Sequence, residues 1–445
     1  MRRRLRLALD LRYATLVIGL LGTTLGLIHS LMGLSLLPPT ASFINYALIG
    51  TGESLNCIAF ALIMVGWSSF ITLVGGQRAL RRRDQHPIAA QLVGGSVDDQ
   101  RVVVADLSRV LAGPYCTMLL ADMGATVIKV ESDAGDDTRT WTPPEKDGVS
   151  TYYMSINRNK RSVVMDFRNP DDLALVKELL RRADVAVENY KHGSLKKFGL
   201  DWESARLINP ALVYLSITGF GTKEGAALPG YDLVVQAVSG LMSLTGEPDG
   251  PALRAGISVF DVMTGLHGTI GVLAALQQRQ RTGEGQHVEV NLLSSAMSGL
   301  VNQTAAYVAG GVVPVRMGNA HPSVYPYQTM PTKDRDVIIT AANDRQFRSL
   351  CNVLGIPEIA DDPRFALNAD RTANRAELHP VLLERLAQWP ADDLFVALNN
   401  AGVPCGPINS IREGVELAER LGLEPRVTVG DGDREVDLVR NPISF

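Results

Sequence analysis

Runs of β-branched residues alternate with helix-like stretches through residues 101–218, and this alternation constrains the fold more than any other feature. The strand-like runs are RVVVADLS (101–108), TVIKVE (126–131), RSVVMDF (161–167), VAVENY (185–190) and PALVYLSI (210–217). Two stretches between them, AGPYCTMLLADMGA and PDDLALVKELLRRA, show helical periodicity. Because the strands are apolar throughout, the pattern predicts a doubly wound, Rossmann-like α/β domain with a parallel sheet.

Ligands of such sheets bind at the carboxyl ends of the strands, where the connecting loops converge. The loops that follow predicted strands are SRVLAGPY, ESDAGDDTR, ENYKHG and TGFGTKEG. Neither a G-x-G-x-x-G pattern nor a Walker A pattern occurs in the chain. The sequence therefore argues against a dinucleotide or nucleoside triphosphate site at these loops.

Charge and cysteine content argue against nucleic-acid binding, a zinc site and a disulfide framework. The chain has 43 Lys and Arg against 47 Asp and Glu, a net charge of −4. It lacks the basic field of nucleic-acid-binding proteins, so we expect no nucleic-acid partner. The four cysteines are far apart and form no C-x-x-C pair, which indicates neither a zinc site nor a disulfide framework. We therefore predict no metal site.

The sequence pattern changes in the second half of the chain, which indicates a second domain. GEGQHVEVNLLSSAMSGLVNQTAAYVAGG is typical of a turn, a strand and one long helix. From about Val312 turn residues and aromatics become frequent, and a strand at RDVIITAAN precedes helices over DRQFRSLCNVLG and AELHPVLLERLAQW. We therefore predict a large domain over residues 96–314 and a smaller α+β domain over residues 315–405.

Residues 1–95 differ in composition from the rest. Residues 13–37 and 54–77 contain no Asp, Glu, Lys or Arg, and each segment is long enough to cross a bilayer as a helix. Arginines precede the first segment and follow the second, which predicts a transmembrane hairpin and linker with both ends in the cytoplasm. A cleaved signal peptide and a buried soluble hairpin are the alternatives. We expect a membrane-anchored protein with a cytoplasmic catalytic domain, or a cytoplasmic protein if this extension is not expressed.

Asp261 occupies an unusual place in RAGISVFDVMTGLHG, between apolar residues and directly before a predicted apolar helix. An aspartate at such a junction can cap the helix by accepting hydrogen bonds from its first N–H groups. It can also be held half-buried because its charge takes part in chemistry. The residues alone leave both explanations open.

Eight ordered motifs decide between these explanations: DLSRVLAGPYCTMLLADMGATVIKVE, NRNKRSVVMDF, ADVAVENYKHG, LPGYDLVVQAVSGLMSLTG, GISVFDVMTGLHGTIGVLAAL, TGEGQHVEVNLLSSA, RMGNAHPSVYPY and GVPCGPINS. With them the chain resembles the class III CoA-transferases, the group of formyl-CoA transferase and carnitine CoA-transferase, from Arg101 to Phe445. The resemblance implies an interlocked homodimer. It also implies that residues 406–445 return to the large domain and would normally continue into a tail, so this chain looks truncated there.

The resemblance implies that Asp261 is the nucleophile of a CoA transfer from an acyl-CoA thioester to a free carboxylic acid. Its carboxylate would attack the thioester and later carry CoA as an aspartyl-CoA thioester. Such an anhydride-forming route needs a dry site and backbone donors for the oxyanion. We expect the helix that begins just after Asp261 to supply these donors. No tightly bound cofactor is expected, since the CoA thioester is itself a substrate.

The resemblance also assigns the residues that contact CoA. They come from the loop after the first strand, from MDFR and NYK, and from nearby cations, and are Val110, Leu111, Ala112, Arg139, Lys160, Arg161, Met165, Asp166, Phe167, Arg168, Asn189, Tyr190, Lys191 and Lys197. This chain departs from formyl-CoA transferase at Leu111 and Ser132, where that enzyme has Gln and Arg. HPSVYPY replaces its glycine-rich lid.

Asp232 in PGYDLVVQA matches a family acidic residue and is a second candidate catalytic residue, either as a helper that orients groups or as a cap on the following helix. α-Methylacyl-CoA racemases share this fold but have G-H-D where this chain has Gly230-Tyr231-Asp232. A tyrosine is a poor base near neutral pH, which disfavours racemization but leaves it as an alternative. A catalytically inactive, membrane-tethered acyl-CoA-binding protein is another. The donor and acceptor acids are not readable; succinyl-CoA is a donor within the family's range, and Arg254 and Arg316 are candidates for selecting a dicarboxylate.

Overall fold

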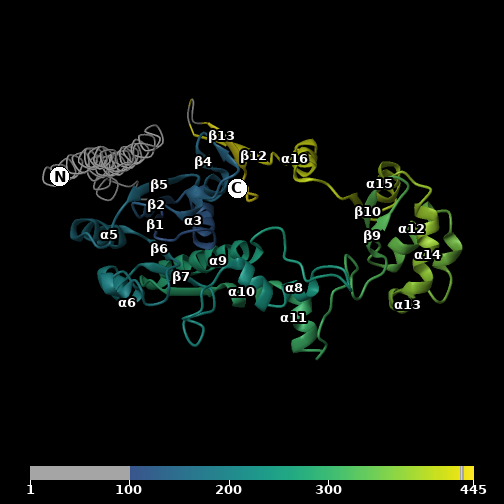
Figure 1. Ribbon diagram of the computed structural model, residues 1–445, viewed down its shortest axis with the longest axis horizontal. Coiled ribbons are helices and arrows are strands. Elements are labelled where there is room, and N and C mark those ends of the chain that lie inside the picture. The colour runs from purple at the N-terminus through teal and green to yellow at the C-terminus, as the bar shows by residue number, and fades with distance from the viewer. Residues whose placement is uncertain (1–100, 431, 433–434, 445) are drawn as a thin grey trace, which may run out of the picture. The chain divides into compact units, whose positions relative to one another are not determined.

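The computed structural model describes residues 101–430, 432 and 435–444. Its largest sheet has six strands, and they follow one another in the order β5-β2-β1-β6-β7-β8 (Figure 1). These strands are β1 (Val103–Asp106), β2 (Thr126–Glu131), β5 (Lys160–Val164), β6 (Val185–Glu188), β7 (Val213–Thr218) and β8 (His287–Asn291). Every neighbouring pair is parallel, which confirms the predicted parallel α/β sheet.

When the six strands are numbered by their order along the chain, they lie in the sheet in the order 3-2-1-4-5-6, which is the order of Rossmann-like folds. The connections after β1 and β6 therefore leave the sheet in opposite directions and open a crevice between these two strands. The central strands are buried on both faces, and their apolar side chains form one core with α3 and α9. This core fixes the position of the crevice.

Helices connect the strands and cover the sheet. They are α3 (Ala112–Asp122), α4 (Thr151–Asn157), α5 (Pro170–Arg182), α6 (Trp202–Ile208), α7 (Asp232–Val238), α8 (Leu241–Leu244), α9 (Val259–Thr282), α10 (Leu292–Gly299) and α11 (Val301–Val308). The sequence of α5 shows why these boundaries arise. Asn169 caps its N-terminus, Pro170 starts it, and Arg181 and Arg182 stand in its last turn, where cations favour the helix dipole.

The structure differs from the sequence-based prediction at two helices. The single long helix expected after β8 is two helices, α10 and α11, because Val301 has a φ of 40°, outside the helical range. The helix expected just after Asp261 begins before it, at Val259, so Asp261 lies within the first turn of α9. α9 ends at Thr282, and the φ of 76° at its C-cap, Gly283, suits a residue without a Cβ.

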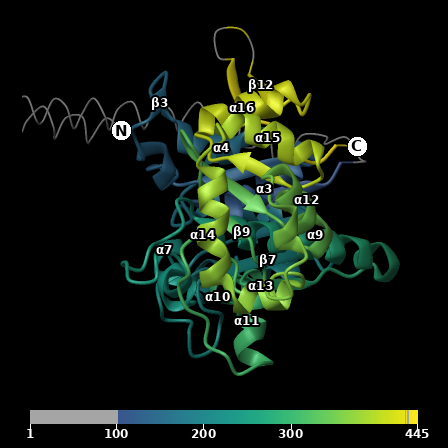
Figure 2. The same cartoon turned by 90° about the vertical axis from the view of Figure 1, so that its right-hand side faces the viewer.

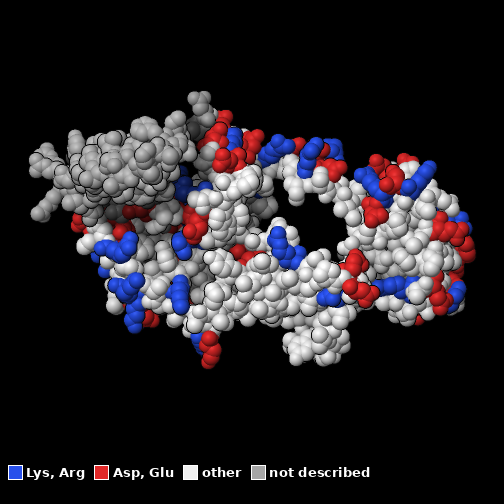
Figure 3. All heavy atoms as spheres, viewed as in Figure 1, with Lys and Arg blue, Asp and Glu red and all other residues white. Residues whose placement is uncertain are grey.

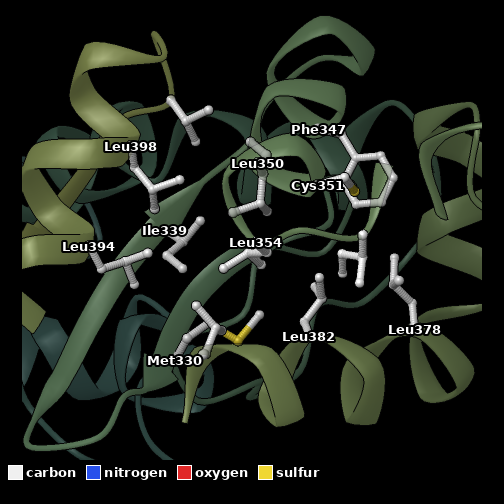
Figure 4. Close-up of a cluster of buried hydrophobic side chains, with 14 of the residues drawn as sticks. Met330, Ile339, Phe347, Leu350, Cys351, Leu354, Leu378, Leu382, Leu394 and Leu398 are labelled. Carbon is white, nitrogen blue, oxygen red and sulfur yellow. The ribbon is translucent and has the colours of Figure 1, made fainter. Parts of the chain in front are cut away.

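A second sheet, β11-β10-β9, has its own apolar core. Its strands are β9 (Tyr327–Pro331), β10 (Asp336–Thr340) and β11 (Cys405–Pro407), and its helices are α12 (Asp344–Val353), α13 (Asn368–Ala373), α14 (Arg375–Leu386) and α15 (Ala391–Asn400). α14 packs on β9 (Figure 2). Side chains from strands and helices, including Met330, Phe347, Leu382 and Leu398, gather in this core (Figure 4). The strand and helices predicted here are present, and β11 runs two residues beyond the predicted boundary at 405.

The last described segment contains α16 (Ile411–Arg420), β12 (Arg426–Val429) and β13 (Val436–Val439), where β12 and β13 form an antiparallel pair. Lys146, in the short hairpin of β3 (Glu145–Lys146) and β4 (Val149–Ser150), donates a hydrogen bond to the carbonyl of Glu435 at 3.0 Å. β13 also contacts α4. The division of the chain at residues 95, 314 and 405 stays a prediction.

The predicted membrane hairpin, residues 13–37 and 54–77, lies outside the described residues. Among the described residues, α9 is the one helix long and apolar enough to span a bilayer by length and composition. It packs against α3, α10, β7 and β8, as the core helix of a globular domain does. These contacts account for the buried face of α9.

Candidate active site

A pocket of about 500 Å³ lies at the carboxyl ends of β1, β6 and β7. It occupies the crevice between β1 and β6, where the strand order predicts a ligand site. Three loops and two helices line it: Arg109–Ala112 after β1, Asn189–His192 after β6, much of residues 217–231 at the end of β7 and after it, Asp261 from α9 and Leu292 from α10. Three of the four loops expected from the sequence thus meet here.

Asp261 presents a half-buried carboxylate to this pocket from the first turn of α9. Burial, and then the negative charge of Asp232, raise its pKa to about 7. A carboxylate in the first turn of a helix is ordinarily stabilised in its charged form by the free N–H groups there. Among the described residues, no donor contacts the Asp261 carboxylate, so nothing offsets the loss of hydration.

Asp232 takes the N–H groups that Asp261 would otherwise use. Its carboxylate is 6% exposed, and its Oδ1 accepts hydrogen bonds from the backbone N–H of Phe260 at 2.8 Å and of Asp261 at 3.2 Å. Asp232 starts α7 but caps α9, a different helix from the one that follows it in sequence. The position of Asp232 fits the orienting role that the sequence suggested.

Two expectations about Asp261 are corrected by this geometry. It does not cap its helix, because Ser258 is the N-cap residue and Asp232 supplies the side-chain oxygen. The N–H groups of Phe260 and Asp261 are occupied by Asp232, so they are not the free oxyanion donors expected from this helix. α3, which begins at Ala112 on the pocket wall, has no side-chain cap and is a better source of free N–H groups.

Six of the predicted CoA-contacting residues come together around the pocket: Val110, Leu111, Ala112, Asn189, Tyr190 and Lys191. Asn189 ties the two loops to each other. Its Oδ1 accepts from the N–H of Arg109 at 2.8 Å, and its Nδ2 donates to the Arg109 carbonyl at 2.7 Å. These two hydrogen bonds hold the loops after β1 and β6 together.

Two predicted cations, buried Lys160 and half-buried Arg139, do not line the pocket. Lys160 is buried, with its Nζ 3.1 Å from Asp106 and 2.8 Å from the Pro114 carbonyl, and burial lowers its pKa to about 8. Arg139 makes two hydrogen bonds of 2.7 Å to Glu131 and lies over the ring of Tyr153. Each cation thus already has a carboxylate partner within the chain.

The remaining predicted contacts lie outside the pocket lining. Arg161 is exposed on β5, Met165 is 3% exposed, and Arg168 pairs with Asp166 at 3.0 Å. Phe167 contacts the rings of Tyr190 and Phe198, and Lys197 lies over Phe198. This aromatic group adjoins the pocket through Tyr190. Arg254 and Arg316 also lie outside the lining; Arg316 donates to the carbonyl of Glu247 at 3.2 Å.

Sequence reasoning missed the buried charges that hold the loop after β1. Lys129 and Asp136 form an ion pair of 2.9 Å and are at most 1% exposed. Asp136 accepts from the N–H of Val110, which has a φ of 67°, a strained value for a β-branched residue. Lys129 donates to the carbonyl of Ser108 at 2.9 Å. A lysine within the apolar strand TVIKVE was the signal that could have revealed this support.

Tyr152 and Gln236 were missed as well. The pKa of Tyr152, on α4, is raised by burial and next by the negative charge of Asp261. Gln236, on α7, is completely buried and bonded to Asp232. Neither residue stands out in sequence, because Tyr and Gln occur in many structural roles.

Comparison with known proteins identifies the family. The family described as CoA-transferase family III matches residues 100–445. The succinate–glutarate CoA-transferase of Agrobacterium fabrum is 48% identical over 350 residues, which cover 76% of this chain and 87% of the relative. The succinyl-CoA:glutarate CoA-transferase of Homo sapiens is 43% identical over 313 residues, 70% and 72% of the two chains. A crystal structure of a CAIB/BAIF family protein from Brucella suis, 45% identical, superposes with a TM-score of 0.69 over 77% of this chain and 91% of that one. The chain therefore belongs to CoA-transferase family III, and it is an enzyme that uses CoA thioesters as substrates.

Proposed function

We propose that this protein moves CoA from a dicarboxylic acyl-CoA, such as succinyl-CoA, to a second short dicarboxylic acid, through a thioester on Asp261. The observation that carries the proposal is the Asp261 carboxylate, which faces the pocket at the crevice between β1 and β6 and has no hydrogen-bond donor among the residues that the structure describes. A carboxylate free of donors keeps its electron pairs available for attack on a carbonyl carbon.

The exchange proceeds through four successive attacks on carbonyl carbons. An oxygen of ionised Asp261 attacks the donor thioester carbonyl and expels CoA thiolate, leaving a mixed anhydride. The thiolate attacks the aspartyl carbonyl of this anhydride and releases the donor acid, which gives the aspartyl-CoA thioester. An acceptor carboxylate then attacks the aspartyl carbonyl and expels thiolate, and the thiolate attacks the acceptor's acyl carbon to regenerate Asp261.

The pocket walls suit the charge that develops in these steps. Each attack produces a tetrahedral oxyanion, which needs preorganised donors. The first N–H groups of α3, at Ala112 and Gly113, belong to a helix terminus without a side-chain cap, and Ala112 lines the pocket. The buried support behind Val110 keeps this helix start in place. We assign the oxyanion donors to α3 for these reasons.

The names of the relatives support the proposed substrate class. The two relatives compared above are named for succinate or succinyl-CoA and glutarate, which are four- and five-carbon dicarboxylates. Purified enzyme should be offered succinyl-CoA with a panel of mono- and dicarboxylic acids, and product CoA esters identified by mass spectrometry. Transfer to glutarate in the wild type and none in Asp261→Asn supports the proposal. Equal turnover in both proteins contradicts it and would favour a racemase or another mechanism.

We also propose that the enzyme acts as an interlocked dimer. On α9, Leu266, Ile270 and Leu273 form an exposed apolar stripe at helical spacing. α11 carries exposed Val308 and Tyr307, and its surface shows no charged side chain (Figure 3). Apolar faces of this kind are usually covered by a partner. Light scattering should give twice the chain mass, and a monomer at micromolar concentration would contradict the proposal.

Membrane attachment through residues 13–37 and 54–77 is a separate proposal that rests on sequence alone. Full-length protein should sediment with membranes and resist high-salt washing, whereas a protein starting at residue 96 should stay in the supernatant. Full-length protein in the supernatant would refute the anchor and leave the catalytic proposal untouched.

A further inference from the structure

Gln236 lies on α7 one turn after Asp232, and its side chain has no exposed surface. Its Nε2 donates to Oδ2 of Asp232 and to the carbonyl of Ile257 at 3.0 Å. Its Oε1 accepts from the N–H of Ala255 at 2.8 Å. Both donor hydrogens and the acceptor of the amide are thus used, which is what burial of such a group requires.

These bonds join the two segments that meet at the nucleophile. Ala255 and Ile257 belong to the segment that leads into α9, and Asp261 lies four residues after Ile257. Asp232 is bound on both sides: Gln236 holds Oδ2, and the N–H groups of Phe260 and Asp261 hold Oδ1. One amide therefore fixes both the entry to α9 and the carboxylate that caps it.

The arrangement decides which aspartate receives the first-turn N–H groups of α9. An aspartate at the third helical position has these groups within reach of its own side chain, and their bonds stabilise its charged form. Here Asp232 takes them, and the Asp261 carboxylate has no donor within the described part of the chain. If Asp232 rotated away, the N–H groups would become available to Asp261, which would then be a weaker nucleophile.

We propose that Gln236 is a positioning residue for CoA transfer: its buried amide holds Asp232 on the first turn of α9, so that the Asp261 carboxylate remains free to attack. The inference rests on the proposed role of Asp261 as the nucleophile. Gln236 itself touches neither substrate nor reacting atoms and acts through Asp232.

Gln236→Met tests the proposal because it keeps the length of the side chain and removes the amide. We expect kcat to fall about tenfold to a hundredfold, while KM for the acyl-CoA changes less than about twofold. The pH midpoint of kcat/KM should fall below that of the wild type, since the released N–H groups stabilise ionised Asp261. Gln277→Met, the same substitution at an exposed position of α9, is the matched control and should leave both quantities unchanged.

Gln236→Glu is the second variant and keeps the acceptor for the N–H of Ala255. It removes the donor to Asp232 and adds a negative charge near Asp261, so kcat should fall as in the Met variant while the midpoint should lie above that of the Met variant. A wild-type kcat and midpoint in either folded variant overturn the proposal. A lower kcat with an unchanged midpoint in both also overturns it, because a general packing defect explains that result.

The covalent adduct separates this proposal from the proposed function. Wild-type enzyme incubated with succinyl-CoA and hydroxylamine should give a hydroxamate at residue 261. If the wild type shows none, the proposed nucleophile fails and this inference fails with it. If the wild type is modified and the folded Met variant is modified at the same rate, only the role of Gln236 is refuted.

Discussion

The carboxylate of Asp232 accepts a hydrogen bond from the backbone N–H of Asp261 at 3.2 Å, so one aspartate caps the helix turn that carries the other. The bond brings two carboxyl groups into the same buried region. Capping satisfies the N–H groups, and the charge of Asp232 adds to burial in raising the pKa of Asp261 to about 7. One contact therefore affects both the geometry and the protonation of the proposed nucleophile.

The first prediction concerns the pH dependence of activity. Only ionised Asp261 can attack, so kcat/KM should rise about tenfold per pH unit below a midpoint near pH 7 and then level off. Asp232→Asn keeps an oxygen for the capping bonds but removes the neighbouring charge, and should shift this midpoint downward. Initial rates from pH 5 to 9 measure it, with Asp393→Asn, at an exposed position of α15, as the control. A midpoint that stays fixed in Asp232→Asn would contradict the coupling.

The second prediction concerns stability. The pKa of Asp261 is raised by folding, so the folded state favours the protonated form, and the contribution of Asp261 to stability falls as pH rises from about 4 to about 7. Asp261→Asn carries no charge and escapes this loss. Solvent screens the partly exposed carboxylate and reduces the effect, so we expect the variant to be more stable than the wild type by about 2 kcal/mol at pH 8. This advantage should disappear near pH 4, where Asp261 is protonated. Urea unfolding at both pH values checks this; an advantage independent of pH would refute the electrostatic cause.

The third prediction concerns the buried Lys129–Asp136 pair. Asp136→Asn leaves the Lys129 ammonium in the core without its counter-charge, which should cost about 3 kcal/mol of unfolding free energy. The N–H of Val110 also loses a charged acceptor, so the loop should loosen and KM for the acyl-CoA should rise. Asp361→Asn breaks an exposed pair with Arg348 and should cost less than about 1 kcal/mol. Equal effects of the two substitutions in denaturant titrations would show that the buried pair has no special role.

The fourth prediction concerns the loop over the pocket. Residues 219 and 230 cross so closely that a Cβ on Gly219 would lie 2.4 Å from the Cα of Gly230. Gly219→Ala must therefore push the two backbones apart and displace pocket residues between them, which should lower kcat/KM by about a hundredfold. A Cβ at Gly406 meets nothing within 4 Å, so Gly406→Ala should retain activity. Full activity in Gly219→Ala would mean that this crossing is not needed for the site.

The loops of the site were predictable because strand period and loop position follow from local sequence. SRVLAGPY, ENYKHG and TGFGTKEG follow apolar strands, and parallel pairing brings them to one edge, where the pocket lies. The break between α10 and α11 was not predictable, because Val301 has no residue-type signal for a positive φ. The strand at RSVVMDF ends earlier than predicted, at Val164.

The partners of the charged side chains could not be predicted, because they are distant in sequence. Lys160 pairs with Asp106, 54 positions earlier, and no local pattern shows that this cation is buried. Asp261 and Asp232 are 29 positions apart, so the sequence could not reveal which aspartate receives the first-turn N–H groups. Residue type and spacing identify candidates, whereas long-range packing decides which candidate is free to react.

The most direct measurement is the mass of the peptide that contains residue 261 after the enzyme meets succinyl-CoA without an acceptor acid. If Asp261 is the nucleophile, hydroxylamine should give a hydroxamate at Asp261, about one adduct per active site, and no adduct in Asp261→Asn. An active wild-type enzyme with an unmodified peptide, or a hydroxamate at another residue, would contradict the account.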